Sequence, residues 1–277
     1  MILSREPFKS NERYRHEWKY LINWGEKEMM TSRMAPILKR DENAINGIYM
    51  IRSLYFDDYW SSAYDEKDAG VLERKKYRIR IYNYQDKVIK LERKKKYDSY
   101  IFKESAGITR DEFEKILAGD YEFLLQSPKS LLREFYIECV CNGLRPRTIV
   151  DYEREPWIMD TGTVRITFDM NVRAAVGSFD IFDSELPCLS VIDPGKLVLE
   201  VKYTELLPKI VQDILPPEAA EFVAVSKYVL CYEKTQYLNE NCYWMEDGHE
   251  MPSLSTPYAP KYKTGDYIFK PDGGVLV

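Results

Sequence analysis

The chain has 277 residues, a net charge of −5, 45% hydrophobic residues and 14% aromatic residues. This length and composition can fill a substantial core and exclude a chain that is disordered throughout. No apolar run reaches 18 residues and the N-terminal stretch lacks a secretory signal, so we expect no membrane segment and a cytoplasmic protein. The five cysteines include no CxxC pair, which in that location indicates reduced thiols.

Alternating and helical patterns follow one another along the chain and predict an α+β protein. Strands are expected at Arg15–Asn23, Ile51–Asp57, Lys75–Asn83, Lys87–Lys95, Arg147–Arg154, Val164–Val172 and Leu197–Thr204, with a weaker one near Asp98–Lys103. Helices are expected at Gly25–Leu38, from a capping box at Thr109 to a stop at Gly119, at Pro128–Asn142, at Leu207–Leu215 and at Ser226–Tyr237. A hairpin turn is expected near Tyr84-Gln85-Asp86. From Asn239 the pattern fails, so we divide the chain into a domain over residues 1–238 and a C-terminal extension over 239–277.

Five of the expected strands pair a charged face with an apolar one, because side chains two residues apart share a face. Arg78 and Arg80, for example, lie opposite Ile79 and Ile81. An ordinary half-exposed sheet would explain this alternation, with the charges facing water. The alternative is a closed sheet with helices packed on its outside, whose charged faces then line an internal tunnel. The mixture of Arg, Lys and Glu on successive strands favours the tunnel.

Positive charge is concentrated in one hairpin of this acidic chain. Between Arg74 and Lys103 there are twelve lysines and arginines and three acids, a local charge of +9. Cations confined in a tunnel repel one another unless an anion binds among them. Guanidinium and ammonium groups suit phosphate oxygens, so a nucleoside triphosphate, an inorganic phosphate chain or a nucleic acid could be the ligand.

Eight segments carry a family resemblance, in the order RHEWKY, SLYFDD, KYRIRIY, KLERKKK, RPRTIVDYERE, VRITFD, VLEVKYT and SKY. Over residues 13–237 the chain resembles the VTC domain, the polyphosphate polymerase module of the vacuolar transporter chaperone family, which bacteria also carry as a free-standing domain. That domain belongs to the triphosphate tunnel metalloenzymes, or CYTH-like superfamily. The resemblance implies a closed eight-stranded antiparallel β-tunnel with a basic lumen and helices on the outside. It also implies transfer of the γ-phosphate of ATP onto a growing polyphosphate chain with Mn²⁺ or Mg²⁺.

Matching the segments residue by residue assigns candidate roles. The resemblance implies catalytic roles for Arg78, Arg80, Lys94, Arg165 and Lys202, substrate binding by Lys19, Lys67, Lys103, Arg154 and Lys227, and metal binding by Glu200. The roles of Glu17, Glu92 and Asp169 stay open. Hydrolases and cyclases of the superfamily usually open with ExExK, whereas this chain has Arg15, Glu17 and Lys19. Its late strand likewise reads Glu200-Val201-Lys202 instead of ExE. Fewer carboxylates favour one main metal ion and a longer anion, hence the polymerase.

Three alternatives stand beside the polymerase. A triphosphatase acting on nucleotides or short polyphosphates would use the same site with water as acceptor. A polyphosphate-binding module without turnover would not need Glu200 among its cations. Nucleic-acid binding ranks last, because it would favour an open basic face with stacking aromatics and this chain is acidic overall. We therefore expect ATP and inorganic polyphosphate as partners, no nucleic acid, and make no prediction of the oligomeric state.

Overall fold

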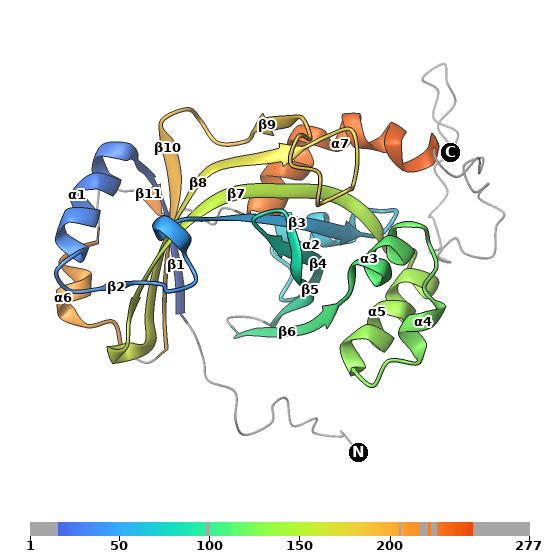
Figure 1. The fold of residues 1–277 in the computed structure, drawn as a ribbon, viewed down its shortest axis with the longest axis horizontal. Helices are drawn as coiled ribbons and strands as arrows, with labels where there is room; N and C mark the ends of the chain where they lie inside the picture. Colours follow the sequence, from blue (N-terminus) through green and yellow to red (C-terminus); the bar gives the residue numbers. More distant parts are fainter. Residues whose placement is uncertain (1–15, 98–99, 205, 216–220, 223–225, 246–277) are drawn as a thin grey trace, which may run out of the picture.

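The computed structural model describes residues 16–97, 100–204, 206–215, 221–222 and 226–245 (Figure 1). Its strands form one sheet, and every pairing between them is antiparallel. The order is β11-β1-β10-β8-β7-β3-β4-β5-β6, with β2 beside β7 and β9 beside β8. The strands are β1 His16–Asn23, β2 Lys39–Arg40, β3 Tyr49–Asp57, β4 Glu73–Tyr82, β5 Gln85–Tyr97, β6 Tyr100–Ile108, β7 Arg145–Met159, β8 Val164–Ala175, β9 Cys188–Ser190, β10 Lys196–Tyr203 and β11 Glu221–Phe222.

The sheet differs from the expected tunnel in strand count and in closure. All eight expected strands are present, and each has eight or more residues, but three further strands of two or three residues bring the sheet to eleven. Among the described residues, no strand pairing joins β6 at one end of the order to β1 or β11 at the other. A strand of two residues carries too little alternation to be recognised in a sequence, which explains why β2 and β11 were missed.

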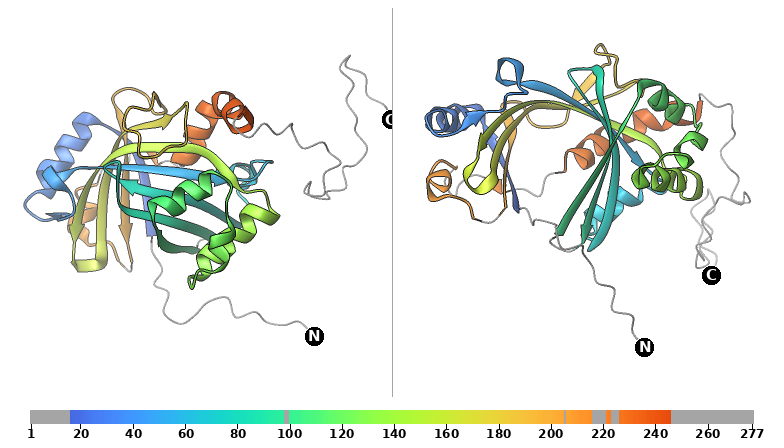
Figure 2. Two further views of the ribbon diagram at one scale, coloured as in Figure 1. Left: turned by 45° about the vertical axis from the view of Figure 1, so that its right-hand side comes forward. Right: turned by 60° about the horizontal axis from the view of Figure 1, so that its bottom comes forward.

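The open sheet nevertheless curls strongly, so that strands far apart in its order face each other (Figure 2). Irregular register at Tyr55/Phe56, Arg80/Tyr82 and Asp151/Glu153 interrupts three of its ladders. Such bulges bend a strand and increase its twist. As a result, Lys94 of β5 comes within 3.5 Å of Glu17 of β1, although five strands lie between β1 and β5 in the sheet order. The concave face therefore surrounds a common space.

Most helices cover the convex, apolar face of the sheet. Helices α1 Trp24–Met34 and α6 Lys209–Gln212 pack on one core with Phe168, and α3 Arg110–Leu117, α4 Glu122–Leu125 and α5 Ser130–Cys141 pack on another with Ile79. The predicted capping box of Thr109 and Glu112 begins α3, and Gly119 follows it in the left-handed region at φ +77°. The predicted helix Leu207–Leu215 is reduced to the four residues of α6. Two 3₁₀ turns, η1 Ile45–Gly47 and η2 Thr161–Thr163, connect strands.

The last helix, α7 Lys227–Met245, corrects the expectation that all helices lie outside. Its Cys231 packs with Ile51 and Val150, which share the concave face with Tyr152. These apolar residues interrupt the otherwise polar concave face and need a cover, which α7 provides by packing on β7 and β8. The short helix α2 Ser62–Asp68 also escaped the sequence analysis; it joins α7 through the Ser61–Tyr232 hydroxyl contact of 2.7 Å.

Two local predictions shift slightly. The β4–β5 turn lies at Asn83 and Tyr84, both at positive φ as in tight hairpin turns, one residue before the expected Tyr84–Asp86. Helix α7 continues across the expected boundary at residue 238, and the remainder of the extension, residues 246–277, lies outside the described residues. None of the described helices has both the length and the hydropathy needed to cross a membrane.

Candidate functional site

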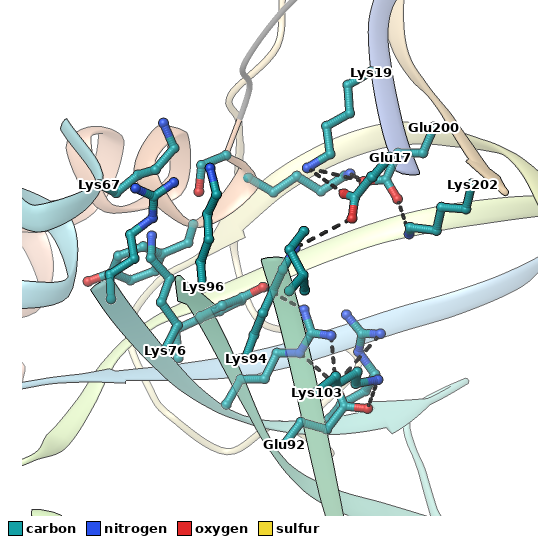
Figure 3. A pocket seen from close by; sticks show the side chains of 18 of the residues that line it. Glu17, Lys19, Lys67, Lys76, Glu92, Lys94, Lys96, Lys103, Glu200 and Lys202 are labelled. Atoms are coloured by element: carbon teal, nitrogen blue, oxygen red, sulfur yellow. Dashed lines mark hydrogen bonds and ion pairs between the residues drawn. The ribbon is translucent and has the colours of Figure 1, made fainter. Parts of the chain in front are cut away.

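The concave face encloses a cavity of about 420 Å³ (Figure 3). Twelve of the residues that line it are cationic and three are acidic, so its lining carries a charge of +9. The cations are Lys19, Lys67, Arg74, Lys76, Arg78, Arg80, Lys94, Lys96, Lys103, Arg154, Lys202 and Lys227, and the acids are Glu17, Glu92 and Glu200. The charged strand faces thus point into a shared pocket, as the tunnel interpretation required.

Ten of the eleven predicted site residues line this cavity, and Arg165 does not. Arg165 shares the concave face with Lys202, its cross-strand neighbour. Its guanidinium instead donates to the Asp41 carboxylate at 2.9 Å and to the Tyr49 hydroxyl at 3.1 Å. Asp41 lies directly after β2, a strand that the sequence did not predict.

Glu200 is the centre of the first charge cluster. One of its oxygens lies 2.9 Å from the Lys227 ammonium and 3.7 Å from that of Lys19. The other lies 2.8 Å from Lys202 and 3.3 Å from the Arg154 guanidinium. Burial opposes ionisation of Glu200, but Lys202, Lys227 and the other two cations outweigh it and hold its pKa well below the usual value.

Asp169 lies behind the residues that line the cavity and contacts two cations of the Glu200 cluster. It is fully buried, and its two oxygens accept a forked pair of hydrogen bonds from Arg154 at 2.6 and 2.7 Å. The Lys227 ammonium lies 2.6 Å from the same carboxylate. Burial disfavours the charge on Lys227, but Asp169 and Glu200 raise its pKa above the usual value. Asp169 therefore orients Arg154 and Lys227 toward the cavity, which gives a structural role to a residue that sequence reasoning had left open.

Glu17 belongs to the same region of the pocket. Its carboxylate lies 3.0 Å from the Lys19 ammonium and 3.5 Å from that of Lys94. Burial raises the pKa of Glu17, but Lys19 and Lys94 overcome this and lower it to about 2. Glu17 thus stays ionised at any physiological pH, and the Lys19 ammonium lies between Glu17 and Glu200.

Glu92 organises a second cluster on β4, β5 and β6. It accepts hydrogen bonds from Arg78 at 2.7 Å and from Lys103 at 2.6 Å. Arg80 lies 4.0 Å away and donates to Ser53 and to the Tyr152 hydroxyl. Burial raises the pKa of Glu92, but Arg78 and Arg80 lower it to about 2. Arg78 also donates to the Tyr55 hydroxyl at 2.8 Å, so both arginine side chains are fixed before any ligand binds.

Sequence reasoning missed three cations of the lining, although its own alternation rule reaches them. Arg74 and Lys76 precede Arg78 by four and two residues on β4, and Lys96 follows Lys94 by two on β5. The cross-strand pairs Arg74–Lys96 and Lys76–Lys94 place them side by side. Lys76 and Lys96 lie within the matched segments KYRIRIY and KLERKKK and Arg74 lies outside them, but the resemblance assigned a role to none of the three.

The residues fit a divalent metal ion that is shared with a substrate. Among the described residues, no group of three or more His, Cys, Asp or Glu side chains could hold a metal ion. Glu17 and Glu200, however, both contact the Lys19 ammonium, which shows that a positive charge fits between them. Mg²⁺ is commonly held by one or two carboxylates and completed by substrate phosphates and water. The pair therefore suits a metal ion that arrives with a phosphate ligand.

The curled antiparallel sheet, with α2 and α7, surrounds a cavity lined by twelve cations and three carboxylates, and such a lining suits a multiply charged anion. The model of the VTC domain matches residues 14–236. The chain therefore belongs to the VTC domain family. No curated protein is significantly similar to it in sequence.

Solved structures resemble the chain only distantly. A candidate adenylate cyclase from Bacillus halodurans is 10% identical, with 77% of this chain and 94% of that chain covered and a TM-score of 0.47. A candidate adenylyl cyclase from Hippeastrum, described as having a dominant triphosphatase activity, is 12% identical, with 80% and 96% covered and a TM-score of 0.45. The PH1012 protein from Pyrococcus horikoshii is 14% identical, with 75% and 94% covered and a TM-score of 0.39.

Proposed function

We propose that this protein is a metal-dependent phosphotransferase that moves the γ-phosphate of ATP onto the end of an inorganic polyphosphate chain held in the pocket. The observation that carries the proposal is the excess of nine positive charges in one cavity. The triphosphate of one nucleotide carries less negative charge than this, whereas each further phosphate of a chain adds more. Membership of the VTC domain family supports the same assignment.

The proposed phosphoryl transfer needs no nucleophile from the protein. The bond between the γ-phosphorus and its bridging oxygen breaks, ADP leaves, and a bond forms from the γ-phosphorus to a terminal oxygen of the chain. That oxygen is already ionised, so no general base is needed. Catalysis then consists of positioning and of neutralising charge on the phosphate oxygens. Arg78 and Arg80 suit this task, because Glu92, Tyr55 and Ser53 hold their planar forks in place.

Lys19, Arg154, Lys202 and Lys227 would bind phosphate oxygens beside the metal site. All four already surround Glu200. Glu200, with Glu17 beside it, would hold Mn²⁺ or Mg²⁺. The metal ion would supply charge neutralisation at the phosphates. Lys94 on β5, Lys103 on β6 and Lys67 on α2 would contact further phosphate oxygens. Arg165 lies outside the cavity and binds Asp41, so we assign it no contact with the phosphates.

Lys94 and Lys103 are suited to respond to an incoming anion. Burial lowers the pKa of each to about 8, despite the opposing effects of Glu17 on Lys94 and of Glu92 on Lys103. Their side chains keep 44% and 48% of their exposure, so water moderates these shifts. Phosphate binding would favour the charged forms and draw protons onto both groups.

The proposal is tested by incubating the purified protein with ATP and Mn²⁺ or Mg²⁺ and resolving products by gel and by phosphate release. The expected products are ADP and chains longer than a triphosphate. The variant Glu200→Gln should abolish them. A matched control is Glu153→Gln, whose carboxylate faces away from Arg154 and accepts a hydrogen bond from Asn171. Loss of product in both variants would argue against a specific role for Glu200.

A triphosphatase is the second candidate, and the exposure of the pocket favours it. The sheet is open between its end strands over the described residues, and Lys94 and Lys103 remain partly exposed. Water could therefore reach a bound triphosphate and replace the chain as acceptor. Free phosphate and ADP without chains would select this function.

A further inference from the structure

Two cations of the pocket come from helices, whereas the others come from strands. Lys67 lies on α2 (Figure 3) and Lys227 begins α7, and both line the cavity. Period-two alternation cannot place a side chain that a helix carries. The positions of these two lysines therefore depend on how the helices are attached to the sheet. One residue, Asp57 at the end of β3, contacts both helices.

The Asp57 carboxylate is buried, with only 2% of the residue exposed. One of its oxygens accepts a hydrogen bond at 2.9 Å from the N–H group of Ala63, in the first turn of α2. The other accepts one at 3.2 Å from the N–H group of Tyr64 and one from the hydroxyl of Tyr228, in the first turn of α7. A single carboxylate thus ties the start of α2 to the start of α7.

Helix α2 needs these acceptors, because its own N-cap residue supplies none. Ser61 has a left-handed backbone at φ +58° and its side chain makes no capping hydrogen bond. Its hydroxyl instead contacts that of Tyr232 on α7 at 2.7 Å, which joins the two helices a second time. The first N–H groups of a helix have no partner within it. In α2 they bind Asp57 and the neighbouring Asp58, which accepts from Ser62 at 2.8 Å.

Tyr228 carries the constraint from Asp57 to α7. Burial and the Asp57 carboxylate raise the pKa of Tyr228 well above its usual value, so its hydroxyl stays protonated and donates. The next residue towards the N-terminus, Lys227, places its ammonium 2.6 Å from Asp169 and 2.9 Å from Glu200. Those two carboxylates orient the ammonium, whereas Asp57 holds the helical turn from which the side chain extends. A phosphate oxygen would compete for the ammonium, so the position of that turn decides how well Lys227 reaches it.

We propose that Asp57 is a positioning residue, which fixes where α2 and α7 begin and thereby where Lys67 and Lys227 meet a bound phosphate. Asp57 is not one of the residues that line the cavity, so it acts through the two helices. The choice of phosphate as the ligand rests on the proposed function. The attachment of both helices rests on the hydrogen bonds of one carboxylate.

The test is a double-mutant cycle on the binding of inorganic tripolyphosphate, measured by calorimetry at pH 7 without metal. Tyr228→Phe removes the hydroxyl that Asp57 binds and keeps the ring. Lys227→Met should bind about tenfold more weakly, the loss of one charge-assisted contact. Tyr228→Phe should weaken binding about threefold in the otherwise unchanged protein, and should have little further effect in the Lys227→Met background.

Asp57→Ala extends the cycle to both helices. Its effect on binding should depend on Lys227 and on Lys67, tested with Lys67→Met, whereas the effect of Tyr228→Phe should depend on Lys227 alone. Loss of the Asp57 charge favours an anion in every background, and the cycle cancels that contribution. The control is Tyr203→Phe, which removes a hydroxyl from a buried tyrosine of the apolar core on the convex face. It should bind tripolyphosphate like the wild type.

Losses that add in the double variants, or unchanged binding in both Tyr228→Phe and Asp57→Ala, would overturn the positioning role. A contact that only stabilises the fold would lower the unfolding temperature without any dependence on Lys227 or Lys67. Thermal unfolding checks each variant, and Asp57→Ala carries the test if Tyr228→Phe does not fold.

The outcome is separable from the proposed function. Chain synthesis from ATP together with additive losses would refute only the positioning role of Asp57. Coupled losses without any chain synthesis would refute only the polymerase. A wild-type protein that does not bind tripolyphosphate would overturn both proposals.

Discussion

The two ends of the pocket carry similar cations in opposite electrostatic settings. Around Glu200, four cations contact one buried carboxylate, and Asp169 binds two of them again. At the opposite end, which Arg74, Lys76 and Lys96 line, the Lys76 ammonium is buried and has no hydrogen-bond partner among the described residues. The first arrangement is balanced before a ligand arrives and the second is not. The comparison teaches that internal carboxylates can hold some cations of a pocket in place while a neighbouring cation is left without a hydrogen-bond partner among the described residues.

The largest effect is expected for Glu200→Gln, which removes the carboxylate charge that four cations of the pocket surround. Turnover of ATP should fall at least about 100-fold, because the metal ion would lose its main ligand. Binding of tripolyphosphate without metal should not weaken, since the variant has one acid fewer among its cations. Initial rates and calorimetry on the same preparation give both readouts. Weaker metal-free binding together with lost turnover would indicate a purely structural role.

Replacing Glu92 by Gln should destabilise the fold in a pH-dependent manner. The folded-state pKa of Glu92 is about 2, against an ordinary value of 4.5. Its stabilisation is therefore fully present above pH 4.5 and is lost as the pH falls toward 2. Urea unfolding should show a loss of about 2–3 kcal/mol at pH 7, shrinking between pH 4.5 and 2. A difference that does not depend on pH would contradict this account.

Two lysine substitutions should change stability in opposite directions. Lys202→Met breaks the 2.8 Å pair with Glu200 and should cost about 1 kcal/mol. Lys76→Met removes a buried amine that has no hydrogen-bond partner among the described residues, and it should raise the free energy of unfolding at pH 7 by at most about 4 kcal/mol. Because the pKa of Lys76 is lowered to about 7 in the folded state, the destabilisation of the fold by Lys76 is largest below pH 7 and disappears above pH 10.5. Destabilisation by both substitutions would remove the contrast between the two ends.

The smallest effect concerns the pH dependence of chain binding. A bound anion favours the protonated form of Lys76. The affinity for long-chain polyphosphate should therefore fall several-fold as the pH rises from 6 to 9, and by no more than the tenfold loss expected for one charge-assisted contact. Lys94 and Lys103, with pKa values of about 8, contribute to the upper part of this fall. In Lys76→Met the part near pH 7 should vanish and the part near pH 8 should remain. Identical profiles for both proteins would exclude titration of Lys76 as a contributor.

Much of the pocket could be predicted, because period-two alternation decides which side chains share a face. Arg78, Arg80, Lys94 and Lys202 lie in the cavity for that reason. Arg74, Lys76 and Lys96 follow from the same rule, although the resemblance assigned no role to them. Eight of the ten predicted residues in the cavity lie on strands and follow from this alternation, whereas Lys67 lies on α2 and Lys227 on α7.

The remaining features depend on contacts between segments distant in the chain. Arg165 donates a hydrogen bond to Asp41, 124 residues away in the sequence, and no local sequence pattern predicts that pair. The position of α7 on the concave face depends on Ile51, Val150 and Cys231 meeting from three elements. Whether the sheet closes depends on its accumulated curl, which alternation within single strands does not determine.

The most direct test of the central claim is primer elongation. A short labelled polyphosphate is incubated with the purified protein, unlabelled ATP and Mn²⁺, and the length of the labelled chain is followed with time on a gel. We expect the label to move to longer chains in single-phosphate steps, with one ADP released for each step. Shortening of the labelled chain, or ATP cleavage to free phosphate while the primer keeps its length, would contradict transfer onto a chain held in the pocket.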